Sequence, residues 1–483
     1  MTQVPERSHA AARFFAYDKS RVAAAPRMSE THQWLHRVTE RQQLEVSRVP
    51  FSAMDRWGFR PDDGSLVHDS GLFFSVEGLH VRTDSAWRPD WVQPIIVQPE
   101  VGFLGLIVKE ISGTLHLLVQ AKAEPGNINT VQISPTVQAT RSNYTGVHRG
   151  SRVRFFEYFD GTRPVRTLVD VLQSEQGAWF FHKRNRNVIV EVFDDIPDHE
   201  NFRWVTLQQL RTLLHLDNVV NMDLRTILSC IPTVLGRNDA ERLLGTVPED
   251  SFAYRLLHSF IGMGNPQLNM ASILSWITDI RSRRECVQRI VPLHHIDRYG
   301  WLRTDHGIMH EEKKYFEVFG TEIRTSDREV NSWMQPLLSP TSTGLLALLV
   351  KKINGTLHAL VQMRVEAGCL NIAELAPTVH CQPANYADAP PEHQPPYLDY
   401  VLTLPRTRIR YDSLQSEEGG RFHHAENRYL LAEVADDFPD EHRAGYRWMT
   451  FGQITSLLEH SHHVNMQLRS LVACAAACTT PAG

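Results

Sequence analysis

The chain is a tandem duplication, and this feature constrains its fold more than any other. The segment VKEISGTLHLLVQ at 108–120 recurs as VKKINGTLHALVQ at 350–362, and LQSEQG at 172–177 recurs as LQSEEG at 414–419. A repeat of roughly 200 residues is far longer than a solenoid unit, so it predicts two globular domains.

The repeat also sets the expected domain boundaries. The first 27 residues are polar and lack the apolar stretch of a signal peptide, so they are typical of an unstructured tail. The segment between the two repeats contains DAERLLG and FAYRLLHSFIG, which favour helices. We expect a tail, a first repeat, a connecting segment, a second repeat and a short tail over residues 1–27, 28–231, 232–271, 272–475 and 476–483.

Local patterns inside each repeat predict a mixed sheet with helical cover. The Asn354-Gly355 pair between two apolar runs is a strong hairpin signal, and Ser112-Gly113 stands at the same place in the first repeat. Thr206 with Gln209, and Thr450 with Gln453, have the spacing of a helix capping box. We expect strands near 73–83, 95–98, 132–138 and 188–193, and helices near 30–45 and 272–289.

Composition limits the class of protein. A hydrophobic fraction of 42% and a charged fraction of 22% are ordinary for a soluble chain, and no apolar run approaches the ~18 residues that span a membrane. A net charge of −5 argues against nucleic-acid binding. The six cysteines form no C-x-x-C pair, which favours reduced thiols in a cytoplasmic protein.

One loop occurs in both repeats, and its charge differs between the two copies. SPTVQATRSNY at 134–144 recurs as APTVHCQPANY at 376–386, and Arg141 becomes Pro383. A guanidinium fork suits phosphate oxygens. Lys183 is lost in the same way, since the second copy has Ala425. These losses of charge predict that a phosphate-bearing ligand is favoured in the first repeat and disfavoured in the second.

Several long strings together identify a family resemblance. FFSVEGLHVRT, QPIIVQPEVGFLGLIVKE, AEPGNIN and SPTVQATRSNY closely resemble the NDP-hexose 2,3-dehydratases of deoxysugar biosynthesis in antibiotic-producing bacteria, and the resemblance covers nearly the whole chain. It implies an α/β (α+β) class with two fused Nudix-like domains, a homodimer, and dTDP-4-keto-6-deoxyglucose as substrate. It also implies a partner enzyme, a downstream 3-ketoreductase, and no nucleic acid or membrane.

The chain lacks the carboxylate helix of true Nudix hydrolases, G-x5-E-x7-R-E-x-x-E-E. AEPGNIN and VEAGCLN keep one glutamate each, which is too few hard oxygen ligands for a catalytic magnesium ion. We therefore expect no metal and no cofactor. The C4 ketone of the expected substrate acidifies the C3 hydrogen, so the protein must supply a base, a donor for the enolate oxygen and an acid for the C2 hydroxyl.

Candidate residues follow from the repeated loops and the resemblance. Trp57 is suited either to stacking on thymine or to packing in the core. A glutamate or a run of charged residues near a turn is also common on a solvent-exposed surface without a function. The catalytic candidates are Glu124, His182 and Tyr144. The substrate-binding candidates are Trp57, Thr140, Arg141, Ser142, Asn143, Tyr144 and Lys183. The matching second pocket, which we expect to be vestigial or structural, has Tyr299, Pro383, Ala384, Asn385 and Tyr386.

Two other function classes remain open at this level. The first is a Nudix-type pyrophosphohydrolase, which the missing metal box disfavours. The second is a non-catalytic nucleotide-sugar-binding or scaffold protein, because duplicated domains often keep binding while they lose chemistry.

Overall fold

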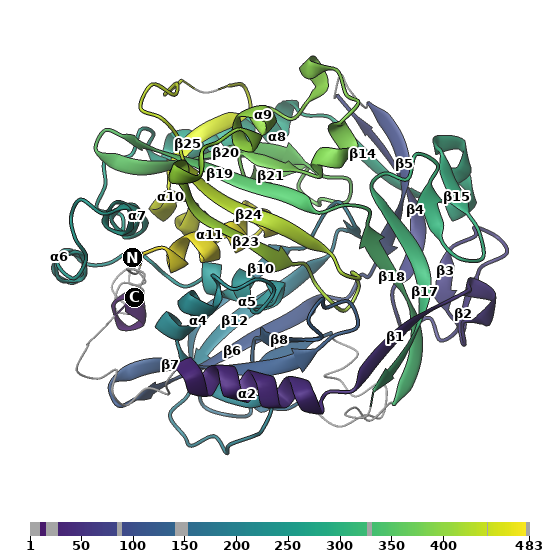
Figure 1. Ribbon diagram of the computed structural model, residues 1–483, viewed down its shortest axis with the longest axis horizontal. Helices are drawn as coiled ribbons and strands as arrows, with labels where there is room; N and C mark the ends of the chain where they lie inside the picture. The colour runs from purple at the N-terminus through teal and green to yellow at the C-terminus, as the bar shows by residue number, and fades with distance from the viewer. Residues whose placement is uncertain are drawn as a thin grey trace.

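The computed structural model describes residues 10–15, 28–84, 89–140, 153–325, 331–441 and 443–479. It is a mixed α+β structure in which two large sheets, two smaller sheets and a central group of helices pack together (Figure 1).

The first repeat forms a seven-stranded mixed sheet, here called the first large sheet. Its strand order is β10-β12-β6-β7-β13, with β8 beside β7 and β9 beside β6. Only β12 and β6 run parallel, and the other pairs are antiparallel. The bounds are β6 (Gly102–Ile111), β7 (Thr114–Ala123), β8 (Val131–Ser134), β9 (Val137–Ala139), β10 (Arg166–Ser174), β12 (Arg184–Glu191) and β13 (Phe202–Thr206).

The second repeat forms a second large sheet with the same topology, in the order β21-β20-β19-β24-β23, with β22 beside β19 and β25 beside β20. The predicted Asn354-Gly355 hairpin is confirmed, and both residues have positive φ, 50° and 81°. The bounds are β19 (Gly344–Ile353), β20 (Thr356–Val365), β21 (Ala373–Ala376), β22 (Val379–Cys381), β23 (Ile409–Ser416), β24 (Glu426–Glu433) and β25 (Tyr446–Thr450).

The two smaller sheets exchange a strand between the repeats. Strand β1 of the first repeat pairs with β17 of the second, and β14 of the second repeat pairs with β4 of the first. The first small sheet contains β2 (Trp57–Phe59), β3 (Leu66–His68), β4 (Ser75–Thr83), β5 (Asp90–Val97), β11 (Phe180–Phe181) and β14 (Cys286–Val291). The second contains β1 (Leu44–Val49), β15 (Trp301–Arg303), β16 (Ile308–His310), β17 (Phe316–Thr325) and β18 (Ser332–Pro340).

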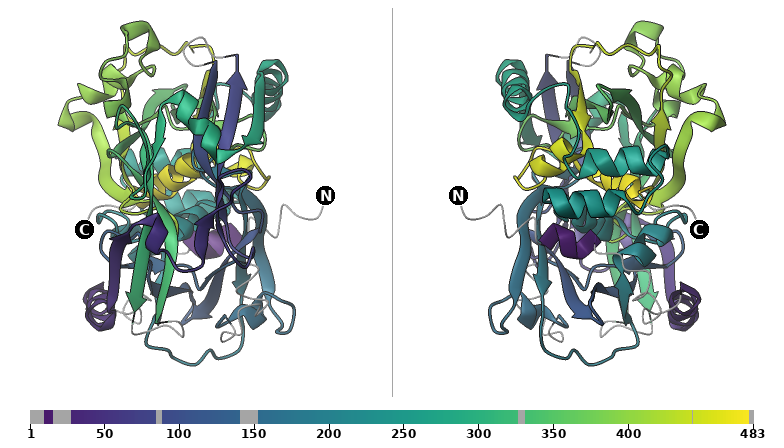
Figure 2. Two further views of the ribbon diagram at one scale, coloured as in Figure 1. Left: turned by 90° about the vertical axis from the view of Figure 1, so that its right-hand side faces the viewer. Right: turned by 90° about the vertical axis from the view of Figure 1, so that its left-hand side faces the viewer.

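Helices occupy the space between the two large sheets. Helices α5 and α11 pack against each other there (Figures 1 and 2), and their apolar faces join both sheets in one core. Both predicted capping boxes are confirmed, at Thr206 before α4 and at Thr450 before α10. The α-helices are α2 (Met28–Arg41), α4 (Leu207–Leu213), α5 (Met222–Ser229), α6 (Arg237–Leu244), α7 (Phe252–Phe260), α8 (Met270–Arg283), α9 (Leu398–Leu402), α10 (Phe451–Leu457) and α11 (Met466–Ala477). The 3-10 helices are η2 (Phe51–Ala53), η3 (Phe156–Tyr158), η4 (Leu293–Tyr299), η5 (Pro383–Tyr386), η6 (Pro391–His393) and η7 (Arg406–Arg408).

Two sequence expectations need correction. The predicted helix over 272–289 ends at Arg283, and the residues from Cys286 onward form β14, the exchanged strand. The repeat alignment pairs Trp57 with Tyr299, but the structural counterpart of Trp57 is Trp301. Trp57 Nε1 donates to Met334 O at 2.8 Å and Trp301 Nε1 donates to Val92 O at 3.0 Å. The pairing shifts because η4 is longer than η2.

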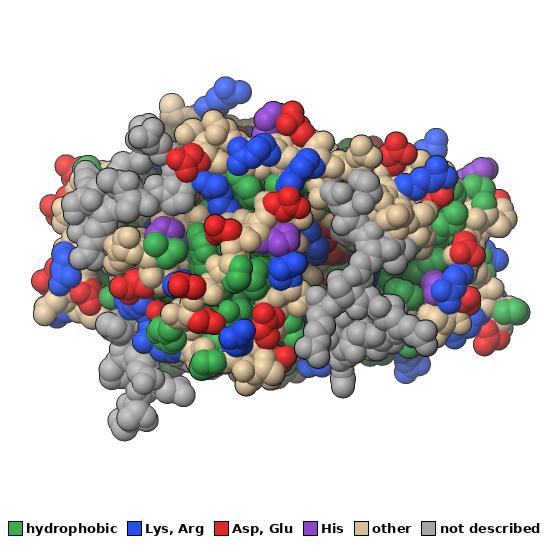
Figure 3. Space-filling view, turned by 90° about the horizontal axis from the view of Figure 1, so that it is seen from below, with side chains coloured by type: hydrophobic (Ala, Val, Ile, Leu, Met, Phe, Trp, Pro, Cys, Tyr) green, Lys and Arg blue, Asp and Glu red, His purple; other side chains and the backbone are tan. Residues whose placement is uncertain are grey.

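The surface carries mixed charge. On the described part of the face in Figure 3, acidic and basic side chains are interspersed. Among the described residues, no helix is both long enough and apolar enough to cross a membrane.

Candidate active site

A polar cluster surrounds Glu124, where the chain turns after β7. Glu124 is 6% exposed, and its Oε1 lies 3.0 Å from Lys122 Nζ and accepts a 3.0 Å hydrogen bond from Gln138 Nε2. Asn221, the N-cap of α5, donates to Gln138 Oε1 at 3.1 Å. Two strands and a helix start of the first repeat thereby hold one carboxylate in place. We call these four residues, with Glu418 and Arg421, the Glu124 cluster.

The second repeat completes this cluster with the loop after β23. Gly126 N donates to Gly419 O at 2.7 Å, which joins the Glu124 turn to that loop. A Cβ on Gly126 would lie 1.8 Å from Phe422 O, and one on Gly419 would lie 3.1 Å from Glu124 Cβ. Only glycine permits so close an approach of the two backbones. The site is therefore composite, with residues from both repeats.

Buried charges meet in the Glu124 cluster. Burial raises the pKa of Glu418, and the neighbouring Glu124 raises it further. Burial lowers the pKa of Arg421, while Glu418 and Glu124 oppose that shift. Burial and the Arg421 cation lower the pKa of Lys183 to about 8. Carboxyls and cations in one water-poor place give this cluster the groups needed for proton transfer and for binding an anion.

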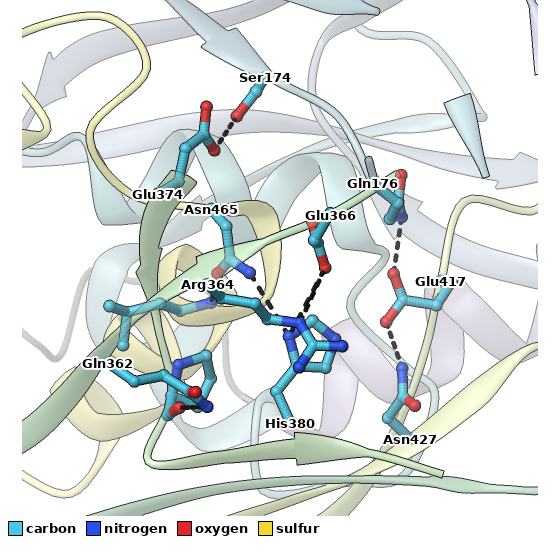
Figure 4. A network of polar contacts seen from close by, with 12 residues as sticks. Ser174, Gln176, Gln362, Arg364, Glu366, Glu374, His380, Glu417, Asn427 and Asn465 are labelled. Carbon is cyan, nitrogen blue, oxygen red and sulfur yellow. Dashed lines mark hydrogen bonds and ion pairs between the residues drawn. The ribbon is translucent and has the colours of Figure 1, made fainter. Parts of the chain in front are cut away.

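A related cluster surrounds Glu366 in the second repeat (Figure 4). Glu366 Oε1 lies 3.4 Å from Arg364 Nε and 3.7 Å from His380 Nδ1, and Asn465 Nδ2 lies 3.5 Å from that same histidine nitrogen. Burial holds the pKa of His380 well below its usual range, and Arg364 lowers it further. Burial raises the pKa of Glu366. The imidazole is therefore neutral near pH 7. We call these four residues the Glu366 cluster.

The Glu366 cluster is composite in the reverse sense. Gly368 N donates to Gly177 O at 2.5 Å, and His182 N donates to Gly368 O at 2.9 Å, so the first repeat supplies the facing loop. A Cβ on Gly368 would lie 2.0 Å from Phe180 O. Each glutamate turn thus faces the glycine loop of the other repeat.

The two clusters differ at four matched positions, one of which is Arg421, where the first repeat has Trp179. Gln138 in the first corresponds to His380 in the second, and Lys122 corresponds to Arg364. Glu418, beside Glu124, corresponds to Gln176. The clusters therefore share a glutamate and an asparagine but differ in the groups that carry protons.

The structure brings together two of the predicted residues and separates a third. Lys183 and Glu124 both interact electrostatically with Arg421, so they belong to one charged region. His182 lies on the other side, where its Nε2 donates to Gln288 Oε1 at 2.7 Å in β14, near the Glu366 cluster. Neighbouring residues 182 and 183 thus serve opposite clusters, which a sequence-based assignment to one pocket did not anticipate.

The aromatic candidates lie elsewhere. Trp57 is 5% exposed and packs in a core shared by the two small sheets. Tyr299 is 39% exposed at the end of η4, where its hydroxyl lies 3.4 Å from Asp90 Oδ1. The contacts of the Trp57 and Tyr299 rings described above include neither Glu124 nor Glu366.

The repeated loop is described in full only in its second copy. Thr140 follows β9, and the predicted residues Arg141, Ser142, Asn143 and Tyr144 lie outside the described residues. In the second copy, Pro383, Ala384, Asn385 and Tyr386 form η5. Asn385 Oδ1 accepts from Tyr315 N at 3.2 Å, and Tyr386 packs against the outer core of the second large sheet.

Sequence analysis missed Gln138, His380, Glu418 and Arg421 as site residues. A usable signal existed, because Gln138 and His380 occupy the same position in PTVQ and PTVH, inside the repeated loop. When the motifs LQSEEG and LQSEQG are aligned, Glu418 corresponds to Gln176. Within the described ranges, no group of three or more His, Cys, Asp or Glu side chains is arranged to hold a metal ion.

Comparison with known proteins decides the family. Residues 28–231 and 270–475 both match the family model described as NDP-hexose 2,3-dehydratase. The chain belongs to this family.

Relatives agree over almost their full length. A Saccharopolyspora spinosa protein named dTDP-4-dehydro-6-deoxy-alpha-D-glucopyranose 2,3-dehydratase is 47% identical over 92% of this chain and 90% of its own. Proteins of the same name from Amycolatopsis orientalis and Streptomyces violaceoruber are 45% and 42% identical, over 95% and 92% of this chain and 92% and 96% of their own. The predicted NDP-hexose 2,3-dehydratase resemblance is thereby confirmed, and the chain is an enzyme of that family.

Proposed function

We propose that the protein removes water across C2 and C3 of dTDP-4-keto-6-deoxyglucose, at the Glu124 cluster. The observation that carries this proposal is that the buried Glu124 lies 3.0 Å from Lys122 and interacts electrostatically with Arg421, which also interacts with Lys183, in a member of this family. The product is a 3,4-diketo-2,6-dideoxy sugar nucleotide, the substrate of a downstream 3-ketoreductase in deoxysugar biosynthesis.

Glu124 is the proposed base. Its Oε1 lies between Lys122 and Gln138, both of which stabilise the ionised carboxylate. Removal of the C3 proton, made acidic by the C4 ketone, gives an enolate. A cation or amide donor placed at the C4 oxygen stabilises that charge, an effect typically worth about 10²–10³ in rate per donor.

Lys183 and Arg421 are the proposed anchors for the diphosphate, with Arg141 from the repeated SPTVQATRSNY loop. Their side chains are partly or largely buried, and a buried cation attracts an anion more strongly than an exposed one does. We retain Thr140, Ser142, Asn143 and Tyr144 as proposed substrate contacts, because they accompany Arg141 in the same loop.

The Glu366 cluster is a second candidate for the active site. His380 is the observation that favours it, because a neutral imidazole 3.7 Å from a carboxylate can accept a proton. We place the reaction in the first cluster because the second lacks counterparts of Lys183 and Arg421. Their positions there are Ala425 and Trp179.

We propose the remaining features on the family resemblance. Each large sheet with its helices would be a Nudix-like domain, with repeats over 28–231 and 272–475 joined by 232–271 and flanked by the tails 1–27 and 476–483. The enzyme would be a cytoplasmic homodimer that needs no cofactor.

The test is turnover in D2O. Purified protein is incubated with dTDP-4-keto-6-deoxyglucose and a 3-ketoreductase, with and without excess EDTA. The expected result is a 2-deoxysugar nucleotide under both conditions, and deuterium at C3 of recovered substrate. Metal-dependent release of dTMP would instead indicate a pyrophosphohydrolase, and binding without any turnover would indicate a scaffold protein.

A further inference from the structure

Glu418 borders the same space as Glu124, although it comes from the other repeat. Gly420 N donates to Glu418 Oε1 at 2.9 Å, and a Cβ built on Gly420 would lie 2.4 Å from that oxygen and 3.7 Å from Glu124 Oε1. The bare Cα of Gly420 therefore separates two carboxyl groups from different domains. No side chain at that position fills the space between them.

The second oxygen of Glu418 is not paired. Its Oε2 is shielded from solvent and has no hydrogen-bond partner among the described residues. A shielded carboxylate oxygen without a donor costs free energy, and a protonated oxygen that can donate to a ligand avoids that cost. Other atoms of Glu418 are partly exposed, so the residue lies at the rim of the cluster.

The surroundings of Glu418 favour its protonated form, whereas Glu124 is held by a cation and an amide donor. Burial and then Glu124 raise the pKa of Glu418, and these effects outweigh Arg421 and Lys122, which lower it. Glu124 is closer to a cation, with Lys122 Nζ at 3.0 Å, and it accepts the amide of Gln138. Two neighbouring carboxyls in unequal surroundings commonly settle as one ionised base and one protonated acid.

The Glu366 cluster has a different neighbouring carboxyl: burial raises the pKa of Glu366, Glu374 raises it further, and Glu374 Oε2 accepts a hydrogen bond from Ser174 Oγ at 2.6 Å. Gln176 stands at the position of Glu418, and its amide donates to Glu417 Oε2 at 2.6 Å (Figure 4). The same amide donates to Met222 Sδ at 2.8 Å. An amide cannot give up a proton to a leaving hydroxide. At this matched position, therefore, only the Glu124 cluster has a group that can protonate the leaving hydroxide.

We propose that Glu418, supplied by the second repeat, is the general acid that protonates the departing C2 hydroxyl in the Glu124 cluster. The inference rests on the proposed function and deepens it. Glu124 takes the C3 proton, the C3–H electron pair forms the enolate and then the C2=C3 bond, and the C2–O bond breaks. The hydroxyl leaves as water with the Glu418 proton. The 2,3-enol tautomerises to the 3,4-diketone by losing its O3 proton and gaining a proton at C2, and proton exchange with solvent restores both carboxyls.

The test separates this step from the rest of the reaction. Glu418→Gln keeps the size of the side chain and removes its acid. Dehydration should fall by about 10²–10⁴-fold, the usual worth of a general acid. Exchange of the C3 hydrogen with D2O should continue, because Glu124 is intact. The substrate analogue with fluorine in place of the C2 hydroxyl should release fluoride at nearly the wild-type rate, because fluoride leaves without a proton.

Controls keep the result decisive. Thermal unfolding confirms that Glu418→Gln is folded, and Glu418→Asp, which keeps a carboxyl, should recover part of the dehydration. Dehydration by Glu418→Gln at the wild-type rate would overturn the inference, and so would an equal loss of fluoride release and dehydration. If wild-type protein neither exchanges C3 hydrogen nor dehydrates, the proposed function itself fails.

Discussion

Arg225 and Arg469 stand at equivalent positions of the two repeats, and each reaches across to the backbone of the other repeat. Arg225 Nη2 donates to Ser416 O at 2.6 Å, and Arg469 Nη2 donates to Ser174 O at 2.5 Å. Both side chains are fully buried. Ser416 directly precedes Glu417, and Ser174 directly precedes Glu175, in the two glycine-containing loops. The two arginines therefore hold in place the loops that complete both clusters.

Replacement of Arg225 by methionine should destabilise the whole protein. The carbonyl of Ser416 and the hydroxyl of Ser470, 2.8 Å from Arg225 Nε, would lose their partner in a water-free place. Each group left unsatisfied costs about 1–3 kcal/mol. Urea unfolding measures the loss. Arg283→Met, which removes an exposed pair with Asp279, is the control and should cost about 0.5 kcal/mol or less. Equal stability of Arg225→Met and wild type would contradict this role.

Separation of the repeats should abolish activity. Each small sheet needs a strand from the other repeat, and each cluster needs the other repeat's glycine loop. Fragments 1–247 and 248–483, made separately, should therefore be inactive and poorly folded. Co-expression of both fragments should restore turnover because every strand and loop is again present. Activity in either fragment alone would show that a cluster is complete without its partner.

Local structure was largely predictable from the sequence. The capping residues Thr206 and Thr450 and the Asn354-Gly355 turn act through backbone hydrogen bonds within a few residues, so their patterns are readable directly. The exchanged strand β14 was not predictable. It continues an apolar helical pattern, and its partner β4 lies two hundred residues earlier, so only tertiary pairing decides its conformation.

The site was predictable only in part. Glu124 and Lys183 were selected from the duplicated motifs, and both interact electrostatically with Arg421. The role of Glu418 was hidden because the repeat pairs it with Gln176, not with Glu124. A duplication aligns equivalent positions, whereas a composite site joins non-equivalent ones. Contacts of the second kind leave no spacing in the sequence.

Lys183 should produce a pH-dependent KM. Its pKa is lowered from 10.5 to about 8, so the ammonium that we propose for diphosphate binding is lost above pH 8. KM should rise through that range, and Lys183→Arg, which stays charged, should flatten the rise. Lys183→Met should raise KM roughly 10- to 100-fold at pH 7. A KM that stays constant from pH 7 to 9.5 in wild type would count against the assignment.

Lys183 also predicts how stability depends on pH. The free energy of unfolding should increase as the pH rises, whereas substrate binding should weaken. Between pH 8 and 10.5 the unfolded chain binds more protons at Lys183 than the folded chain does, so the free energy of unfolding rises with pH over this window. At pH 7 the buried charge costs stability. Lys183→Met should therefore raise the unfolding midpoint at pH 7 while it weakens substrate binding, a combination that a purely structural lysine would not give.

Arg141 and Asn385 should separate binding from folding. Arg141→Ala should weaken substrate binding by about 1.5–3 kcal/mol, the range for a hydrogen bond to a charged group, with little change in stability. Asn385→Ala should do the reverse, because Asn385 bonds Tyr315 N and Gln382 within the fold. Isothermal titration and thermal unfolding of both variants check this. Full kcat/KM in Arg141→Ala would remove Arg141 from the site.

The most direct measurement compares two matched variants, Glu124→Gln and Glu366→Gln, in the coupled assay with dTDP-4-keto-6-deoxyglucose and a 3-ketoreductase. The two glutamates occupy equivalent turns and both are buried, so the substitutions disturb the fold to a similar degree. We expect Glu124→Gln to lose 2-deoxysugar formation and C3 deuterium exchange, and Glu366→Gln to keep both. Full activity in Glu124→Gln, with loss of activity in a folded Glu366→Gln, would place the chemistry at His380 and Glu366 and contradict the account.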